Sequence, residues 1–145
     1  MSYEFKRIRY ADLNARQKEN YNFQKVSAVL ADFGFVTLRL TDDWQGADFI
    51  AQHINGETFL KVQLKGRLTF DRKYIGKDLF VAFEHKGAWY LYPHDELLNQ
   101  VLLETNTMSG TLSWEQRGRY SWNRLSQQLL GLLEPFRIDE ANLKT

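Results

Sequence analysis

Three side chains in the middle of the chain could perform chemistry together: the carboxyl of Asp48, the amide of Gln63 and the ammonium of Lys65. Two strand-like runs, ADFIAQHI and ETFLKVQL, are joined by Asn55-Gly56, which is typical of a two-residue hairpin loop because both residues accept positive φ. That loop sets Asp48 directly opposite Gln63, with Lys65 two residues further along the same face. Facing Cβ atoms in an antiparallel pair lie about 4.5–5.5 Å apart. We therefore expect the three groups to converge.

Phosphodiester hydrolysis with a divalent cation needs a set of this kind. Mg²⁺ (or Mn²⁺) prefers oxygen ligands, so Asp48 would supply a charged ligand and Gln63 a neutral carbonyl oxygen. The cation lowers the pKa of a bound water. Lys65 would orient that water and offset the charge that develops on phosphorus. The alternative interpretation is a polar, solvated face of a half-buried hairpin.

Elements on both sides of the hairpin are expected to position it. Before it, apolar residues at helical spacing predict a helix from about Asp12 to Phe33, with Asp12 as its N-cap and Gly34 as its stop. A short strand over 35–40 and a polar turn, TDDWQG, then lead into the hairpin.

After the hairpin, DLFVAFE and AWYLYP predict two further strands. Pro93 is expected to open a helix that ends near Glu104, and a last helix is expected from about Tyr120 to Leu133. This order predicts a single α/β (α+β) domain, residues 1–145, in which a mixed sheet of about five strands is flanked by helices.

The composition is that of a folded, cysteine-free chain. Hydrophobic residues make up 43% of its 145 residues, and the absence of cysteine excludes disulfides, zinc–thiolate sites and thiol nucleophiles. His53, His85 and His94 show no spacing typical of a metal cluster, so structural or surface roles are expected for them. The start, MSYEFKRIRY, lacks the apolar stretch of a secretory signal, and no apolar run approaches the roughly 20 residues of a membrane span. We expect a soluble, cytoplasmic protein.

Lys and Arg gather in two segments, KGRLTFDRKYIGK and WEQRGRYSWNR, although the net charge is only +1. The first segment is expected to be a basic loop along a DNA backbone beside the site, and a merely solvated loop is the alternative. Four of its side chains are the expected phosphate contacts: Arg67, Arg72, Lys73 and Lys77. The four tryptophans, Trp44, Trp89, Trp114 and Trp122, are expected mostly in the core or an interface, and of these Trp114 and Trp122, in the second segment, are the best candidates to touch a base.

The stretch GADF, the Asn-Gly hairpin, LKVQLKGR and DLFVAFEHKGAWYLYPHDEL together resemble the PD-(D/E)XK nuclease superfamily, and more narrowly its restriction-type and resolvase-like branch in which the second motif is QxK. The resemblance covers roughly residues 12–104 and implies a restriction-endonuclease-like core. It also implies that Asp48 is the metal-binding aspartate and that Gln63 and Lys65 form the motif pair. Ala47 replaces the usual proline, and Gln63 replaces the usual glutamate. Relatives with QxK often draw another acid from the first helix, where Glu19 is the candidate.

The resemblance implies a metal-dependent endonuclease of the restriction or repair type, acting on double-stranded or branched DNA with Mg²⁺ or Mn²⁺. A domain of this size holds one active centre, so cutting both strands suggests a homodimer. The alternative is a catalytically inactive nuclease-like module that binds nucleic acid or a protein partner. A purely structural interaction domain is a third possibility. Only the enzyme requires a divalent ion at Asp48.

Overall fold

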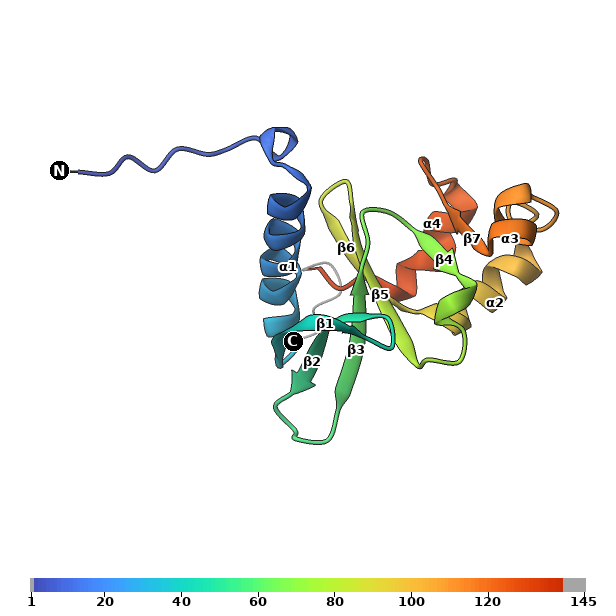
Figure 1. The fold of residues 1–145 in the computed structure, drawn as a ribbon, viewed down its shortest axis with the longest axis horizontal. Helices are drawn as coiled ribbons and strands as arrows, with labels where there is room; N and C mark the ends of the chain where they lie inside the picture. The colour runs from blue at the N-terminus through green and yellow to red at the C-terminus, as the bar shows by residue number, and fades with distance from the viewer. Residues whose placement is uncertain (1, 140–145) are drawn as a thin grey trace.

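A five-stranded mixed sheet forms the centre of the computed structural model, which describes residues 2–139 (Figure 1). In spatial order its strands are β1 (Phe35–Trp44), β2 (Ala47–His53), β3 (Phe59–Leu64), β5 (Leu79–His85) and β6 (Ala88–Pro93). Neighbouring strands are antiparallel except β3 and β5, which are parallel. The expected fold class, a mixed sheet of about five strands flanked by helices, is confirmed.

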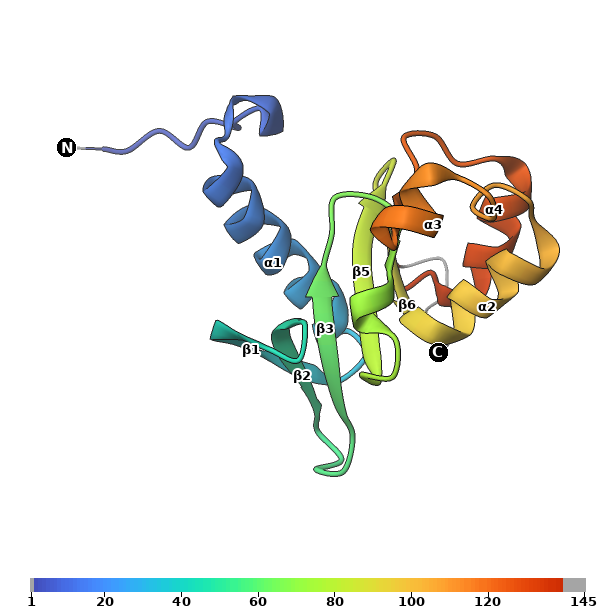
Figure 2. The ribbon, with the colours of Figure 1, turned by 45° about the vertical axis from the view of Figure 1, so that its right-hand side comes forward.

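Helices lie on both faces of this sheet, as two views show (Figures 1 and 2). One face is covered by α1 (Ala15–Ala31), and the other by a layer made of α2 (His94–Glu104), α3 (Leu112–Arg117) and α4 (Gln127–Leu133). A second, two-stranded sheet pairs β4 (Thr69–Asp71) with β7 (Arg119–Ser121). Three short 3₁₀ turns complete the elements: η1 (Tyr10–Asp12), η2 (Arg72–Tyr74) and η3 (Glu134–Phe136). Among the described residues, no helix is long and apolar enough to cross a membrane.

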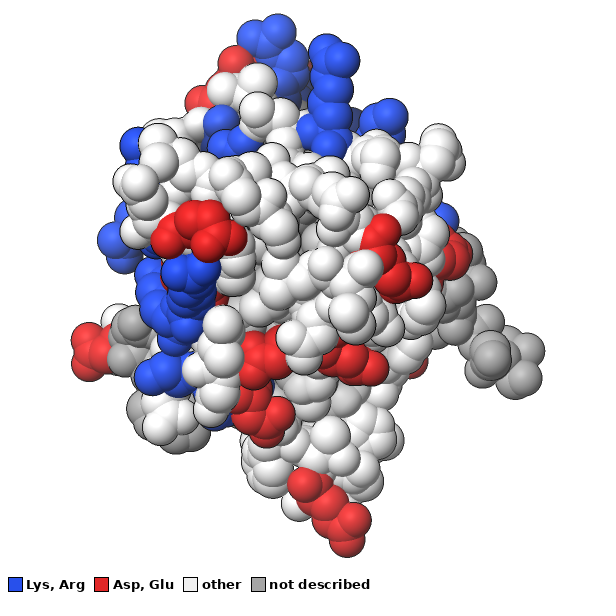
Figure 3. Space-filling model, turned by 90° about the vertical axis from the view of Figure 1, so that its right-hand side faces the viewer, with Lys and Arg blue, Asp and Glu red and all other residues white. Residues whose placement is uncertain are grey.

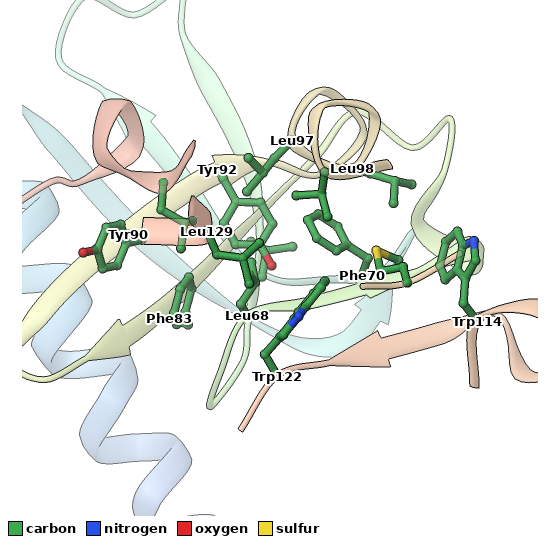
Figure 4. Packing of buried hydrophobic residues seen from close by; sticks show 14 of the residues in the cluster. Leu68, Phe70, Phe83, Tyr90, Tyr92, Leu97, Leu98, Trp114, Trp122 and Leu129 are labelled. Carbon is green, nitrogen blue, oxygen red and sulfur yellow. The ribbon is translucent and has the colours of Figure 1, made fainter. Parts of the chain in front are cut away.

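Two main cores result from this layering, besides a small cluster of Ala47, Tyr74 and Leu79. Under α1, Val26 and Leu30 pack with Phe49 and Val62 of the hairpin. The larger core lies on the opposite face and is dominated by aromatic and leucine side chains (Figure 4). Its largest fully buried members include Phe70 of β4, so the small sheet is part of this second core and not an appendage.

Charge is unevenly distributed over the face that the α2–α4 layer presents. Acidic and uncharged side chains occupy its centre, whereas Lys and Arg gather along one edge and at one end (Figure 3).

The register of the central hairpin is as predicted. Phe49 pairs with Val62, and Ala51 pairs with Leu60. These four side chains are apolar and belong to the core under α1. Because strand side chains alternate between faces, Asp48 and Gln63 point to the other side.

The prediction of a two-residue hairpin loop was wrong. Four residues, 54–57, lie between the last hydrogen-bonded pair of the hairpin, His53 and Thr58. The last hydrogen bond of the pair runs from the His53 N–H to the Thr58 carbonyl (2.9 Å). Inside the loop Gly56 alone has positive φ (75°), and the Asn55 carboxamide oxygen accepts the N–H of Glu57 at 2.8 Å. Asn55 therefore shapes the turn through its side chain and not through a left-handed backbone. The strand register is unchanged, since both loops leave His53 opposite Thr58.

The start of α1 also differs from the prediction. Asn14 is the N-cap, and its side chain accepts the Gln17 N–H at 2.8 Å while the Gln17 side chain accepts the Asn14 N–H at 2.9 Å. This reciprocal capping box satisfies two backbone donors at once, which the earlier Asp12 cannot do. Asp12 instead ends η1 and pairs with Arg9.

Strand β1 runs past the expected end to Trp44, so part of the predicted polar turn is strand and the chain reverses at Gln45-Gly46. The start of α2 after Pro93 and its end at Glu104 are confirmed.

Two predictions in the C-terminal half were wrong for one reason. Residues 65–77, expected to be a basic loop, instead contain β4 and η2 and bury Leu68 and Phe70. Residues 119–121 are not helical, because β7 pairs with β4, and α4 begins only at Gln127 with Ser126 as its N-cap. The pairing of these two distant segments outweighs the helical spacing of the apolar residues in the second.

Candidate active site

The hairpin, the turn before it and the segment after it enclose an open cleft of about 550 Å³. It brings together all three residues of the predicted triad, Asp48, Gln63 and Lys65. The remaining lining residues are Gln45, Gly46, Lys73, Tyr74 and Lys77.

The carboxyl group of Asp48 is exposed to solvent but fixed in orientation. Its Oδ2 accepts the backbone N–H of Leu64 at 2.8 Å, which ties the start of β2 to the end of β3. Gln63 is half-buried beside it, with its amide nitrogen 3.5 Å from the Leu64 carbonyl oxygen. The acid and the amide thus stand on the same side of the hairpin, as predicted.

Lys65 directly follows β3 and is half-buried. Its backbone N–H donates to the Ala82 carbonyl oxygen (2.9 Å), so the parallel pairing with β5 holds its main chain in place. Its Nζ lies 5.7 Å from the centre of the Tyr74 ring, and the Nζ of Lys73 lies 5.3 Å from the same ring. The aromatic ring therefore provides both ammonium groups with a favourable contact inside the cleft.

Burial is the main reason why the pKa of Lys65 lies below its ordinary value of 10.5. The positive charges of Arg119 and Lys73 lower the pKa further, while the carboxylates of Asp48 and Asp71 act in the opposite direction. Lys65 is thus the centre of a compact group of charges of both signs.

The turn before β2 requires a glycine to approach Tyr74. Gly46 has φ +87°, and a Cβ at this position would lie 3.1 Å from two carbons of the Tyr74 ring. Both the backbone conformation and the close contact disfavour a larger residue.

The four expected phosphate contacts divide into two pairs. Lys73 and Lys77 line the cleft. Arg67 and Arg72 do not, because Arg67 donates to the Asn123 side chain and Arg72 lies 4.7 Å from the centre of the Trp114 ring. Arg72 is also 3.8 Å from the Glu115 carboxylate.

Glu19 is exposed on α1 and is not among the residues that line the cleft. The inner side of α1 packs against Phe49 and Val62, which face away from Asp48 and Gln63. Among residues 2–139, no group of three or more Asp, Glu, His or Cys side chains is placed to hold a metal ion.

Trp114 and Trp122 lie in the core, as expected for the tryptophans, and their buried rings are not placed to stack on a base. They are 5% and 8% exposed and belong to the larger core. Trp122 packs edge-on against Phe70, with ring centres 5.7 Å apart.

A buried histidine clamps the wall of the cleft that carries Lys73. His94 has no exposed surface, and its Nε2 accepts the Asp71 N–H at 3.1 Å. Because Nε2 accepts, Nδ1 carries the proton and donates to the Asp95 carboxylate at 2.8 Å. The other oxygen of Asp95 accepts the Gly76 N–H at 2.9 Å. Both ends of the segment 71–76 are thereby attached to the start of α2, which is a structural role as predicted for this histidine.

This clamp predicts a loss of stability in mild acid. Burial lowers the pKa of His94 below its ordinary value of 6.5. Just below pH 6.5 the unfolded chain therefore binds a proton at this histidine, whereas the folded protein does not. The contribution of neutral His94 to the free energy of unfolding is complete above about pH 6.5, and it falls as the pH drops below that value. Thermal unfolding midpoints between pH 7.5 and 5.5 should decline steeply in the wild type and less steeply in His94→Gln. Equal pH dependence in both proteins would contradict this role.

The structure also places residues in or near the cleft that sequence reasoning did not assign to the site, namely Gln45, Tyr74, Asp71 and Arg119. Tyr74 stands beside the predicted Lys73 in the sequence, which is a local signal. Arg119 reaches the site only through the pairing of β7 with β4, in which it faces Asp71. No local pattern indicates that contact.

A comparison with protein-family models and one with curated proteins found no match to this chain. Among solved structures, the chain is similar to Hjc, a Holliday junction resolvase from the archaeal hyperthermophile Archaeoglobus fulgidus, with 19% identity over 51% of this chain and 76% of that chain and a TM-score of 0.42. It is also similar to the bacterial homing endonuclease I-Ssp6803I, with 16% identity over 86% of each chain and a TM-score of 0.46. Both TM-scores lie below 0.5, and similarities of this strength do not establish a shared function.

Proposed function

We propose that this protein is a metal-dependent endonuclease that hydrolyses DNA phosphodiester bonds. The observation that carries the proposal is the convergence of Asp48, Gln63 and Lys65 in one open cleft that Lys73 and Lys77 also line. An acid, an amide oxygen and several ammonium groups around one cavity suit a phosphate bound with a divalent cation.

The donor set of the cleft fits Mg²⁺ in the form in which proteins usually bind it. Mg²⁺ keeps several waters and takes one or two carboxylates together with substrate phosphate oxygens. Asp48 would supply the carboxylate and Gln63 an amide oxygen. When bound, such an ion lowers the pKa of a coordinated water and polarises the phosphoryl oxygen. Because one carboxylate is a sparse set, metal affinity should be weak without DNA and greater with it.

The side chains of the cleft have separable roles in this proposal. The hydrogen bond from Leu64 holds the Asp48 carboxylate at the end of β3, so its charge is preorganised. Lys65 presents an ammonium group to the scissile phosphate, where it offsets negative charge in the transition state. Lys73 and Lys77 hold the substrate phosphate at the rim of the cleft.

More specifically, we propose an endonuclease of the restriction or repair type that acts on double-stranded or branched DNA. One cleft of this kind serves one strand, so cutting both strands would require two copies of the chain, most simply as a homodimer.

The test is a cleavage assay on duplex, branched and single-stranded DNA, with Mg²⁺, with Mn²⁺ and with EDTA. Cleavage that requires the metal supports the proposal. A protein that binds DNA but cleaves no substrate under any of these conditions would be a binding module instead. That second candidate is favoured by one observation: among the side chains that the structure describes, no second carboxylate joins Asp48 in the lining of the cleft.

Gln63→Glu is expected to tighten Mn²⁺ binding, because it adds a second carboxylate to the proposed metal site. Calorimetric titration of the wild type and the variant, without DNA, would measure the change. Gln45→Glu is a useful control, since it adds the same charge at another position of the same cleft. Unchanged affinity in Gln63→Glu, or an equal gain in both variants, would count against Gln63 as a ligand.

A further inference from the structure

Two short segments of this chain have a strong excess of positive charge. Residues 65–77 and 114–124 together contain eight Lys and Arg against two acidic residues, a net charge of +6 in a chain whose net charge is +1. The rest of the chain is therefore acidic overall. A one-sided distribution of this kind is typical of a surface that binds a polyanion.

The fold joins these two segments into one surface beside the cleft. The Arg72 N–H donates to the Gly118 carbonyl oxygen at 2.7 Å, and the Arg72 side chain packs against Gly118. Arg117 and Arg119, on either side of this glycine in the chain, are both exposed. Figure 3 shows that Lys and Arg gather along one edge of the layer that contains α3.

Arg119 connects this surface with the candidate active site. It faces Asp71 across the β4–β7 pair, and the Asp71 side chain accepts the N–H of Lys73, which lines the cleft. Positive charge thus continues from the cleft onto β7 and the end of α3.

The aromatic side chains of the two segments decide which kind of nucleic acid this surface fits. Proteins that bind single strands stack the bases on exposed aromatic rings. Here Phe70, Tyr74, Trp114 and Trp122 are buried, and Tyr120 is half-buried against Trp122. Basic side chains remain exposed while the rings are in the core, and this combination suits the backbone of paired strands, whose bases are already stacked on each other.

We propose that Arg117 and Arg119 form a duplex-flank surface, which binds the phosphate backbone of double-stranded nucleic acid next to the scissile phosphate. The proposal rests on the proposed function and specifies its substrate class: the site acts beside a paired segment and not within a long single strand.

The experiment compares the affinity of the wild type and of Arg117→Gln/Arg119→Gln for a duplex and for a single strand of equal length, in EDTA and at several salt concentrations. Each lost phosphate contact removes about 0.9 from the salt slope on duplex DNA, so the double variant should flatten the plot of log K against log salt by about 1.8. The wild type should bind the duplex more tightly than the single strand. A matched control is Arg16→Gln/Lys25→Gln, which removes the same charge from exposed positions of α1 and should leave the slope unchanged.

The outcomes separate this inference from the proposed function. An unchanged slope in Arg117→Gln/Arg119→Gln, an equal effect of the α1 control, or a preference for the single strand would overturn the duplex-flank surface while metal-dependent cleavage could still be observed. A wild type that binds no nucleic acid but binds acidic protein or anionic vesicles would overturn both.

Discussion

Lys65→Ala is expected to lower the rate of Mg²⁺-dependent cleavage by about 10²–10³-fold, the usual effect of removing one preorganised group that stabilises transition-state charge. Lys65 is the ammonium group of the triad, and the hydrogen bond from its backbone N–H to Ala82 of β5 holds its main chain in place. Asp48→Asn is expected to cause a loss of similar size. Asparagine keeps an oxygen that can accept the Leu64 N–H, so this variant removes the charge and spares the hydrogen bond.

Single-turnover cleavage rates would measure both losses, and DNA affinity in EDTA would be measured beside them. The affinity should change little, because Lys73, Lys77 and the duplex-flank surface remain. Lys77→Ala is the matched control for Lys65→Ala, since it removes one ammonium group from the rim of the same cleft and should reduce cleavage much less. Cleavage at the wild-type rate in both Lys65→Ala and Asp48→Asn would place the activity elsewhere or in a contaminant.

Trp122→Ala is expected to lower the free energy of unfolding by about 3–5 kcal/mol, as large aromatic deletions in cores do. The indole is 8% exposed and packs against Phe70 and Tyr120. Domains of this kind are stable by only about 5–15 kcal/mol, so this loss would be a large fraction of the total. Urea unfolding followed by circular dichroism would measure it.

Arg124→Ala is the control for this prediction, because Arg124 is exposed in the same segment and surface substitutions usually change stability by less than about 0.5 kcal/mol. If Trp122→Ala unfolded like the wild type but lost DNA affinity, the indole would be a nucleic-acid contact after all. Trp122→Phe keeps an aromatic ring in the core, so its free energy of unfolding should lie between that of the wild type and that of Trp122→Ala.

Local sequence determined the hairpin and therefore the triad. Alternation of apolar and polar residues in ADFIAQH and FLKVQL assigns Phe49 and Val62 to the core and leaves Asp48 and Gln63 on the other side. A shift of one residue would bury the acid, so the register is strongly specified even though the loop itself has four residues and not two. The strands on either side and the helix after Pro93 follow from equally local patterns.

Only the tertiary structure decided what surrounds that triad. Residues 65–77 look like a basic loop because their charges are frequent, yet pairing with residues 119–121 makes part of them strand β4 and buries Phe70. The same pairing places Arg119 near Lys65. It also brings Arg72 against the Trp114 ring, and both Trp114 and Trp122 are part of the core. Glu19 stays outside the cleft because α1 packs on the other face of the sheet. These outcomes depend on contacts between residues far apart in the chain, where burial of large aromatic surface outweighs local propensity.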